Sequence, residues 1–245
     1  MNAETKNTLR KLVPKPMESF GRSLKRRLTD VDCHKSYSQE GEDMILRRIF
    51  EEKLREKRPG FYVDVGAHHP KRFSNTYFFY RLAWSGINID AMPDSMCEFR
   101  RLRPRDINLE AAFAKEPGEL TYYAFDEPAL NTLDVRMAQF HKDQGACRLL
   151  EERRIVTKTL GEILRRYLPA AKKVDFMSID VEGMDLEVLQ SNDWTLCRPE
   201  CIISESLGSS LEDLDQNLIC TFLRGQGYQP FAKTVNSMIY TQVKL

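Results

Sequence analysis

FYVDVGAHHP, residues 61–70, is the stretch of sequence that decides the fold. Its apolar run ends in Asp64 and turns at a single glycine, Gly66, which is typical of a buried strand followed by a tight turn. The turn lacks the GxGxxG pattern with which a glycine-rich loop cradles a pyrophosphate. This strand end is therefore suited to a ligand that carries no pyrophosphate.

The composition is that of an ordinary globular protein with one sizeable α/β domain. The 245 residues are 42% hydrophobic and 30% charged, with a formal net charge of +1. This balanced charge gives no electrostatic reason to expect a nucleic-acid partner. No apolar run approaches the ~20 residues of a membrane-spanning helix, and the start of the chain lacks the apolar stretch of a secretory signal.

The six cysteines are scattered along the chain and form no CxxC pair. Zinc sites usually show paired spacing, and a chain of this length does not need disulfides to fold. We therefore expect reduced thiols, which favours a cytoplasmic protein.

The first 35 residues differ in character from the rest. They are rich in Lys and Arg, carry two prolines, and space their apolar residues loosely, as on one face of a helix. We expect a basic arm, residues 1–35, in front of a domain that spans residues 36–245. Two roles remain open for the arm: a peripheral contact with an anionic membrane surface or a partner protein, and a solvated lead-in to the domain.

From residue 61 onward, strand and helix signals alternate. Near-continuous apolar strands separated by helices predict a mostly parallel sheet with helices on both faces. Residues 228–243 predict two strands about a short turn, an antiparallel hairpin added to the sheet. In the middle of the chain, INLEAAF (107–113) predicts one strand and GELTYYAFD (118–126) an extra strand, followed by an irregular insertion at residues 127–150.

Carboxylates dominate the expected carboxyl ends of the strands, which is where parallel α/β sheets bind ligands. The expected ends are Asp64, Asp90, Ala112 or Phe113, Asp180 and Glu205. Acids at four of these five ends argue against a phosphate-rich ligand. Asp90 lies 26 residues after Asp64, close to the position of the acid that grips a ribose in nucleotide-binding folds. An adenosine without phosphates but with a cationic amino-acid end fits this pattern, as in S-adenosylmethionine.

Six stretches in a fixed order carry a resemblance to a known family. They are YSQEGED (37–43), FYVDVGAHHP (61–70), SNTYFFY (74–80), GINIDAMP (86–93), MSIDVEGMDLEVLQSNDW (177–194) and RPECIISE (198–205). In these stretches the chain resembles the FkbM-type family of S-adenosylmethionine-dependent methyltransferases. The resemblance implies a Rossmann-like class I methyltransferase fold with a mostly parallel seven-stranded sheet. It also implies O-methylation of a sugar or natural-product hydroxyl, as in glycan biosynthesis.

The resemblance further implies which residues hold the cofactor. They are Asp64, Gly66 and Ala67 under the methionine part, Asp90 on the ribose, Ala112 beside the adenine and Asp180 at the catalytic edge. Structural alternatives stay open for two of them. Asp64 could cap the turn that follows it, and Asp90 could be a turn residue before Pro93.

Three polar residues near these motifs are further candidates. His68 and His69 are adjacent on a turning backbone and point in different directions, so we do not expect both to bind one metal. We group His68 with the cofactor residues and His69 with the catalytic candidates, the alternative being structural hydrogen bonds. Gln39 precedes a predicted helix, where it is expected either to reach the active site or to cap that helix.

The segment SIDVEGMDLEVL carries the expected chemistry. Asp180 ends a buried strand, and Glu182 opens the next helix, so either can accept a proton from an acceptor hydroxyl, with His69 as the third candidate base. Glu182 and Glu205 are the expected acceptor contacts. Carboxylates on neighbouring strand ends also suit Mg²⁺; this metal remains an alternative that the sequence does not favour.

Several alternatives remain open at this point. The basic run FRRLRPRD (99–106) suggests either a phosphate of the acceptor or a solvated, charged helix end. An NAD-type oxidoreductase and a non-catalytic, cofactor-binding partner subunit are the rival functions, and the missing GxGxxG argues against the first. The expected partner is a small-molecule or glycan acceptor, whereas the oligomeric state is not predicted.

Overall fold

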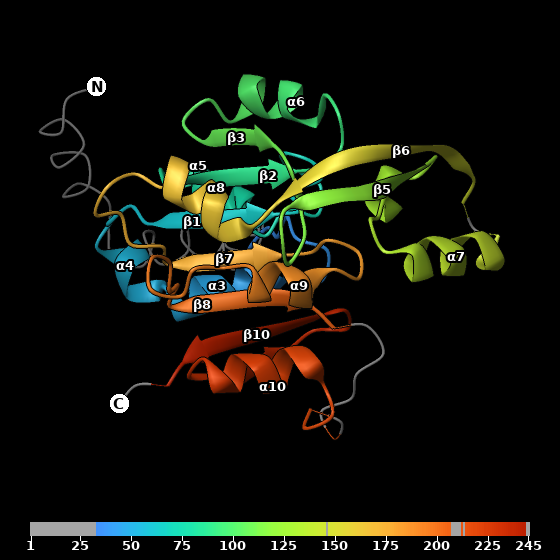
Figure 1. Ribbon diagram of the computed structural model, residues 1–245. Helices are drawn as coiled ribbons and strands as arrows, with labels where there is room; N and C mark the ends of the chain where they lie inside the picture. The colour runs from blue at the N-terminus through green and yellow to red at the C-terminus, as the bar shows by residue number, and fades with distance from the viewer. Residues whose placement is uncertain (1–32, 146, 207–211, 213, 244–245) are drawn as a thin grey trace, which may run out of the picture. The chain divides into compact units, whose positions relative to one another are not determined.

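The computed structural model describes residues 33–145, 147–206, 212 and 214–243 (Figure 1). The chain consists of two units, Met1–Ser36 and Tyr37–Leu245, and the second carries every helix and strand described below. The predicted basic arm, residues 1–35, lies almost wholly outside the described residues, so its role stays a prediction. In the described part of the chain, no helix is long and apolar enough to span a membrane.

Seven strands form the main sheet, in the order β3-β2-β1-β7-β8-β10-β9. They are β1 (Phe61–Val65), β2 (Ser85–Asp90), β3 (Ile107–Glu110), β7 (Phe176–Ile179), β8 (Cys201–Glu205), β9 (Tyr228–Lys233) and β10 (Ser237–Gln242). The first five run parallel to one another, whereas β10 pairs antiparallel with both β8 and β9. The prediction of a mostly parallel seven-stranded sheet with a C-terminal antiparallel hairpin is confirmed.

The strand order reverses between β1 and β7. β2 and β3 lie on one side of β1, and β7 and β8 lie on the other. The register pairs Asp64 with Ser178 and Val65 with Ile179, so the residues that follow the two strands meet at one edge of the sheet. A reversal of this kind marks the place where open α/β sheets bind ligands.

Helices cover both faces of the main sheet (Figure 1). They are α3 (Glu42–Ile49), α4 (Glu51–Arg55), α5 (Tyr77–Arg81), α6 (Ser95–Leu102), α8 (Leu160–Tyr167), α9 (Asp185–Gln190) and α10 (Leu218–Gly225). Leu46 of α3 and Phe79 of α5 pack with Tyr62 in one buried cluster, whereas Leu189 of α9 and Val63 belong to another. Neighbouring residues of a strand point to opposite faces, so β1 serves both clusters.

A smaller sheet of three strands lies beside the main one, in the order β4-β6-β5. Its strands are β4 (Ala112–Phe113), β5 (Gly118–Phe125) and β6 (Leu149–Lys158), and the short helices η1 (Pro128–Leu130) and α7 (Val135–Gln144) lie between β5 and β6. Figure 1 shows β5, β6 and α7 projecting from one side of the main sheet. We call residues 118–158 the insertion.

Two predictions for the middle of the chain were wrong. The stretch 107–113 is not one strand but two: β3 pairs with β2 in the main sheet, whereas β4 pairs with β6 in the smaller sheet. The stretch 127–150 is not irregular, since it contains α7. Asp134 accepts from the Arg136 amide at the start of this helix and Gly145, with φ of 64°, ends it; both are ordinary helix-boundary signals.

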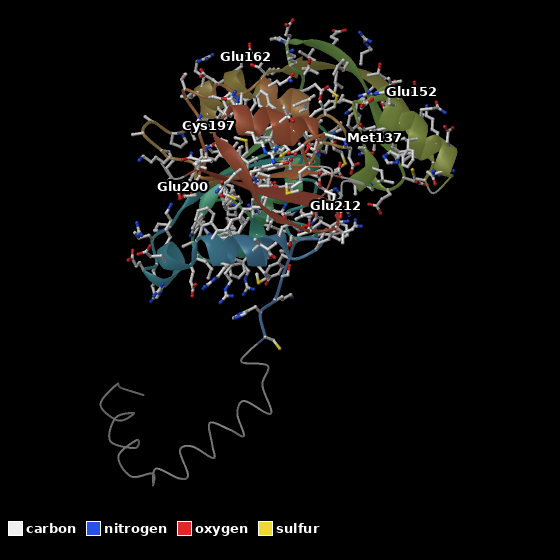
Figure 2. The ribbon with its side chains drawn as sticks, turned by 90° about the horizontal axis from the view of Figure 1, so that it is seen from below. Met137, Glu152, Glu162, Cys197, Glu200 and Glu212 are labelled. Atoms are coloured by element: carbon white, nitrogen blue, oxygen red, sulfur yellow. The ribbon has the colours of Figure 1, made fainter. Side chains whose placement is uncertain are left out.

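The insertion packs against the loop that follows β7. A Cβ built on Gly183 would lie 2.6 Å from Cγ of Met137, a residue of α7 labelled in Figure 2. The Thr132 hydroxyl donates to the Glu182 carbonyl at 2.7 Å. An ion pair between Lys142 and Glu152 at 3.0 Å also joins α7 to β6. The insertion therefore borders the same sheet edge as the strand ends.

Candidate active site

A cleft opens at the carboxyl ends of the strands, where the strand order reverses. Its empty volume is about 1040 Å³, including the space at its open mouth. Nine of the predicted site residues line it: Gln39, Asp64, Gly66, Ala67, His68, Asp90, Ala112, Asp180 and Glu182. The insertion contributes further lining residues, among them Tyr122, Asn131 and Thr132.

Gly66 forms the turn after β1, with φ of 77°. The amides of Gly66 and Ala67 both donate to the Ile89 carbonyl in β2, at 2.9 and 3.0 Å. A Cβ built on Gly66 would lie only 1.7 Å from the Asp180 carbonyl oxygen. The backbone conformation and the adjacent strand end thus both exclude a side chain, which explains the single glycine in this turn.

Asp64 is a buried carboxylate in the wall of the cleft, 5% exposed. Its Oδ2 accepts a hydrogen bond of 2.6 Å from the hydroxyl of Thr76, the residue before α5. Burial raises the pKa of Asp64 to about 6, and the nearby Arg103 and the Thr76 hydroxyl act in the opposite direction. Burial thus favours the protonated form of Asp64, and a specific donor holds its carboxylate against this effect.

Asp90 connects the turns that follow β1 and β2. Its Oδ2 accepts from the His68 amide at 2.7 Å and its Oδ1 from the Met92 amide at 2.8 Å. Burial raises the pKa of Asp90, and these two amides lower it. Both oxygens are fixed in position and keep lone pairs that can accept hydrogen bonds from a ligand. The turn role considered for Asp90 and a ligand role are thus compatible.

Three carboxylates form a cluster at the other end of the cleft: Asp180 after β7, Glu182 two residues later, and Glu205 at the end of β8. One oxygen of each lies within 4.8 Å of the others. Burial raises the pKa of Glu182 and Glu205, and repulsion from Asp180 raises the pKa of both further. Desolvation also raises the pKa of Asp180, and there the repelling carboxylates are those of Asp64 and Glu42. Such a cluster holds at least one proton near neutral pH, or it suits a cation.

Asp185, at the start of α9, sits behind this cluster. Its carboxylate accepts from the Glu205 amide at 3.0 Å and the Val181 amide at 3.2 Å, so it fixes the backbone of both loops. Burial, followed by repulsion from Asp180, raises the pKa of Asp185 to about 8.

The Glu182 backbone has φ of 49°, which is uncommon for a residue other than glycine.

The structure does not bring every predicted residue into the cleft. His69 is not among the residues that line the cleft in the part of the chain that the structure describes. Its Nδ1 accepts from the amides of Lys71 and Arg72 at 3.0 and 2.8 Å, and its Nε2 lies 3.4 Å from Glu98. Glu205 does not line the cleft either, but it adjoins the lining through the carboxylate cluster. His68 does line it, and burial lowers the pKa of its imidazole.

The polar side chains that line the cleft fit S-adenosylmethionine better than a dinucleotide. Among the residues that the structure describes in the lining, four are carboxylates and none is a lysine or arginine. Carboxylates attract a cation and accept hydrogen bonds from hydroxyls, whereas a pyrophosphate would be repelled. The insertion adds the hydroxyl of Tyr122 and the amide of Asn131 to this lining, and both groups can hydrogen-bond to a ligand.

Sequence reasoning missed two groups of residues that matter here. One is the contribution of the insertion, since Tyr122 and Asn131 lie in a segment with no motif of its own. The other is Thr76, which lies inside the stretch SNTYFFY but has no role of its own in the sequence motifs. The spacing of Thr76 from Asp64 gives no signal, because their contact depends on how the loop between β1 and α5 folds.

Several solved methyltransferase structures resemble this chain weakly. A methyltransferase from Geobacter sulfurreducens is 11% identical, with a TM-score of 0.41 over 100% of this chain and 98% of that chain. A putative caffeoyl-CoA O-methyltransferase from Staphylococcus aureus is 8% identical, with a TM-score of 0.44 over 90% and 91%. A precorrin-6y C5,15-methyltransferase from Geobacter metallireducens is 14% identical, with a TM-score of 0.41 over 82% and 88%.

No curated protein matches the sequence. The model of a protein family, the methyltransferase FkbM domain, matches residues 64–230, which is more than half of the chain. The match begins at Asp64 and contains every strand end that forms the cleft, so it confirms the resemblance found in the sequence. This protein belongs to the FkbM family of methyltransferases.

Proposed function

We propose that this protein is a cytoplasmic S-adenosylmethionine-dependent O-methyltransferase that acts on a sugar hydroxyl of a glycan, glycoconjugate or natural product. Membership of the FkbM family makes it a methyltransferase. The finer proposal rests on the cleft at the strand-order reversal. The part of its lining that the structure describes has four carboxylates and neither lysine nor arginine. That lining favours a ligand rich in hydroxyls and bearing a cation.

The half of the cleft after β1 and β2 would hold the cofactor. Asp64 faces its cationic amino-acid end, and the turn at Gly66 and Ala67 lets the backbone approach the ligand closely. Asp90, with both oxygens already oriented, accepts hydrogen bonds from the ribose hydroxyls. Ala112 lies beside the adenine, and its small side chain leaves room for the ring. Gln39 and His68 complete the wall.

The half of the cleft after β7 and β8 would hold the acceptor. S-adenosylmethionine, when bound, supplies an activated methyl group. Glu182 and Glu205 accept hydrogen bonds from the sugar hydroxyls and orient one of them. As the oxygen of this hydroxyl takes the methyl group, its proton passes to the carboxylate of Asp180 or Glu182. Desolvation, followed by repulsion from neighbouring carboxylates, raises the pKa of Asp180 and of Glu182, which supports this role.

His69 is the weaker candidate base, because its Nδ1 already accepts two backbone amides and it lies outside the described lining. A divalent cation at Asp180, Glu182 and Glu205 remains the alternative to direct hydroxyl contacts. The proposed chemistry does not require it. The insertion, which borders the loop at Glu182, is the segment expected to distinguish acceptors.

Ligand-induced stabilisation tests the cofactor assignment first. S-adenosylhomocysteine, the product of methyl transfer, should raise the melting temperature, because a ligand that binds only the folded state stabilises it by mass action. NAD at the same concentration should not. Transfer of a labelled methyl group to a panel of sugars and glycosides then tests the acceptor class. A shift with NAD and none with S-adenosylhomocysteine would overturn the assignment, and transfer only to amines or carbons would overturn O-methylation.

A further inference from the structure

The basic run FRRLRPRD contains one arginine that is neither solvated nor available to a phosphate. Arg103, just after α6, is 0% exposed, although Arg100 and Arg101 on the same helix are exposed. Burying a guanidinium without hydrogen bonds would cost several kcal/mol, so its partners indicate what it does. Neither of the two interpretations drawn from the sequence describes this residue.

One side of the Arg103 guanidinium is bound to structural partners. Its Nε donates to Asp106 at 2.8 Å, and its Nη2 donates to the Tyr62 hydroxyl at 2.7 Å. Asp106 in turn accepts from the Gly86 amide at 2.9 Å and from Asn88 at 3.0 Å. These contacts join α6 to β1 and β2 and keep the guanidinium in one orientation.

The same guanidinium also extends toward the cofactor half of the cleft. Nη2 of Arg103 also donates to the Thr76 hydroxyl at 3.0 Å, and this hydroxyl donates to Oδ2 of Asp64 at 2.6 Å. An arginine can only donate, so the Thr76 hydroxyl accepts from Arg103, and an ionised carboxylate can only accept, so the hydrogen of that hydroxyl points to Asp64. A buried positive charge therefore lies one hydroxyl away from Asp64.

We propose that Arg103 is a positioning residue that acts through Thr76 to keep the Asp64 carboxylate ionised and oriented toward the cationic end of the cofactor. This role rests on the proposed function, because it requires Asp64 to contact that cofactor. It assigns a task to Arg103 and Thr76, neither of which is among the described residues that line the cleft. The Thr76 side chain makes no capping hydrogen bond to α5; apart from Arg103 and Asp64, its hydroxyl contacts the Ser74 hydroxyl at 3.2 Å.

The charges around Asp64 explain why such support is needed. The groups that face it are Arg103 and Asp106 beyond α6, Thr76 before α5, Asp90 at the end of β2 and Asp180 after β7. Burial is the main cause that raises the pKa of Asp64 to about 6, and the neighbouring carboxylates raise it too. Only Arg103 and the Thr76 hydroxyl lower it. Without them, Asp64 would take up a proton nearer neutral pH.

Substitutions at Thr76 test this relay without removing a buried charge. Thr76→Val removes the hydroxyl at nearly constant volume, and Thr76→Ser keeps it. Thr157→Val is the matched control, because Thr157 is 1% exposed and its hydroxyl has no hydrogen-bond partner among the described residues. Two quantities would be measured against pH in the full-length protein: the carbon-13 shift of the Asp64 carboxyl without ligand, and the affinity for S-adenosylhomocysteine by calorimetry.

The expected result is a shift of the pH profile and not a uniform loss. Losing the hydrogen bond to the ionised form raises the pKa of Asp64, so Thr76→Val should titrate at higher pH than wild type, whereas Thr76→Ser and Thr157→Val should titrate as wild type does. For a rise of about one pKa unit, affinity at pH 6 falls about fivefold relative to Thr76→Ser. At pH 8 the two variants should agree within about twofold.

Arg103→Lys tests the charged end of the relay. A lysine keeps the charge but cannot reach Tyr62, Asp106 and Thr76 together, so the pKa of Asp64 should rise in this variant as well. If this variant does not fold, the Thr76 series still decides the matter. An unchanged Asp64 titration in Thr76→Val, or an equal loss of affinity at every pH, overturns the relay alone. If the wild-type protein binds no S-adenosylhomocysteine at any pH, the proposed function falls and the relay falls with it.

Discussion

The carboxylates that follow β1 and β2 differ from those that follow β7 and β8 in what surrounds them. Asp64 and Asp90 each accept hydrogen bonds between 2.6 and 2.8 Å from a hydroxyl or from backbone amides. In the described part of the chain, the side chains of Glu182 and Glu205 accept none of the hydrogen bonds found and instead lie within 4.8 Å of each other and of Asp180. One half of the cleft is supported by donors, and the other is crowded with acceptors.

This difference matches two kinds of chemistry. A carboxylate that is held by donors keeps one charge and one position, which suits a ligand whose charge does not change on binding. Carboxylates that repel one another bind a proton more readily, which suits a group that must take a proton during a reaction. The proposed cofactor and acceptor halves of the cleft thus differ in how the carboxylates of Asp64 and Asp90 and those of Glu182 and Glu205 are held.

The largest effect is expected from Asp180→Asn, which removes a carboxylate of the crowded half. Turnover should fall by roughly 10²–10⁴-fold, the usual contribution of a positioned general base. Methyl transfer to an acceptor found in the sugar panel would measure it. If the variant keeps wild-type turnover, Asp180 is not the base, and Glu182→Gln becomes the next variant to assay.

Gly66→Ala tests the close contact between the turn after β1 and the end of β7, where the two halves of the cleft meet. Its Cβ would meet the Asp180 carbonyl, and its φ of 77° is unfavourable for alanine, so the free energy of unfolding should fall by about 3 kcal/mol or more. Gly225→Ala is the control, because a Cβ there meets nothing within 4 Å, and it should change stability by less than about 1 kcal/mol. Denaturant titration of both would compare them, and equal stability would refute the close contact between the strand ends.

The effect of Glu205→Gln on stability should depend on pH, which sharpens the contrast between the two halves of the cleft. A carboxyl whose pKa is raised in the folded state binds more protons there than in the unfolded state. Its contribution to stability is therefore lost as the pH rises from about 4, the ordinary pKa of the unfolded chain, toward the raised pKa of the folded state. Neutralising Glu205 should therefore stabilise the ligand-free protein at pH 8, on the order of 1 kcal/mol, and have little effect at pH 4.

Melting curves at both pH values would measure the effect of Glu205→Gln. Glu200→Gln serves as control, because Glu200 lies outside the cluster and pairs with Lys53 at 2.8 Å. A surface pair of this kind contributes little, so this variant should be neutral or slightly destabilising at pH 8. Destabilisation by Glu205→Gln at pH 8 would contradict the crowding of the acceptor half.

The smallest effect is expected from deleting residues 1–30. Every proposed cofactor contact lies later in the chain, so the affinity for S-adenosylhomocysteine should stay within about twofold, which is less than 0.5 kcal/mol. Calorimetric titration of the truncated protein would measure it. A marked loss of affinity would mean that the arm belongs to the cofactor half and that the boundary near residue 35 is wrong.

Local sequence patterns predicted the main sheet and most of the cleft for a clear physical reason. β1 is five consecutive buried residues and β2 has a buried middle, so their apolar runs are visible in the sequence, and the polar residue that ends a run falls at the sheet edge. Asp64, Asp90 and Asp180 were found this way. α7 was missed although Asp134 and Gly145 mark its ends, because its apolar face is short and it buries few residues.

Other features depend on contacts that no local pattern encodes. Arg103 looks like one more charge in a basic run, and only the fold shows that it is buried against Tyr62 and Asp106. Tyr122 alternates along β5 like any strand residue, yet it lines the cleft because the insertion packs beside the main sheet. Residues far apart in sequence create both environments, so periodicity and spacing cannot reveal them.

The division of the cleft is tested most directly by titrating S-adenosylhomocysteine into Asp90→Ala and Asp180→Asn side by side. Asp90→Ala removes the oriented acceptor for the ribose, about 1.5–3 kcal/mol of hydrogen bonding, so its affinity should fall roughly ten- to a hundredfold. Asp180→Asn should bind within about threefold of wild type, because its carboxylate acts on the acceptor. The reverse pattern, with Asp180→Asn losing the ligand and Asp90→Ala retaining it, would contradict the assignment of the two halves.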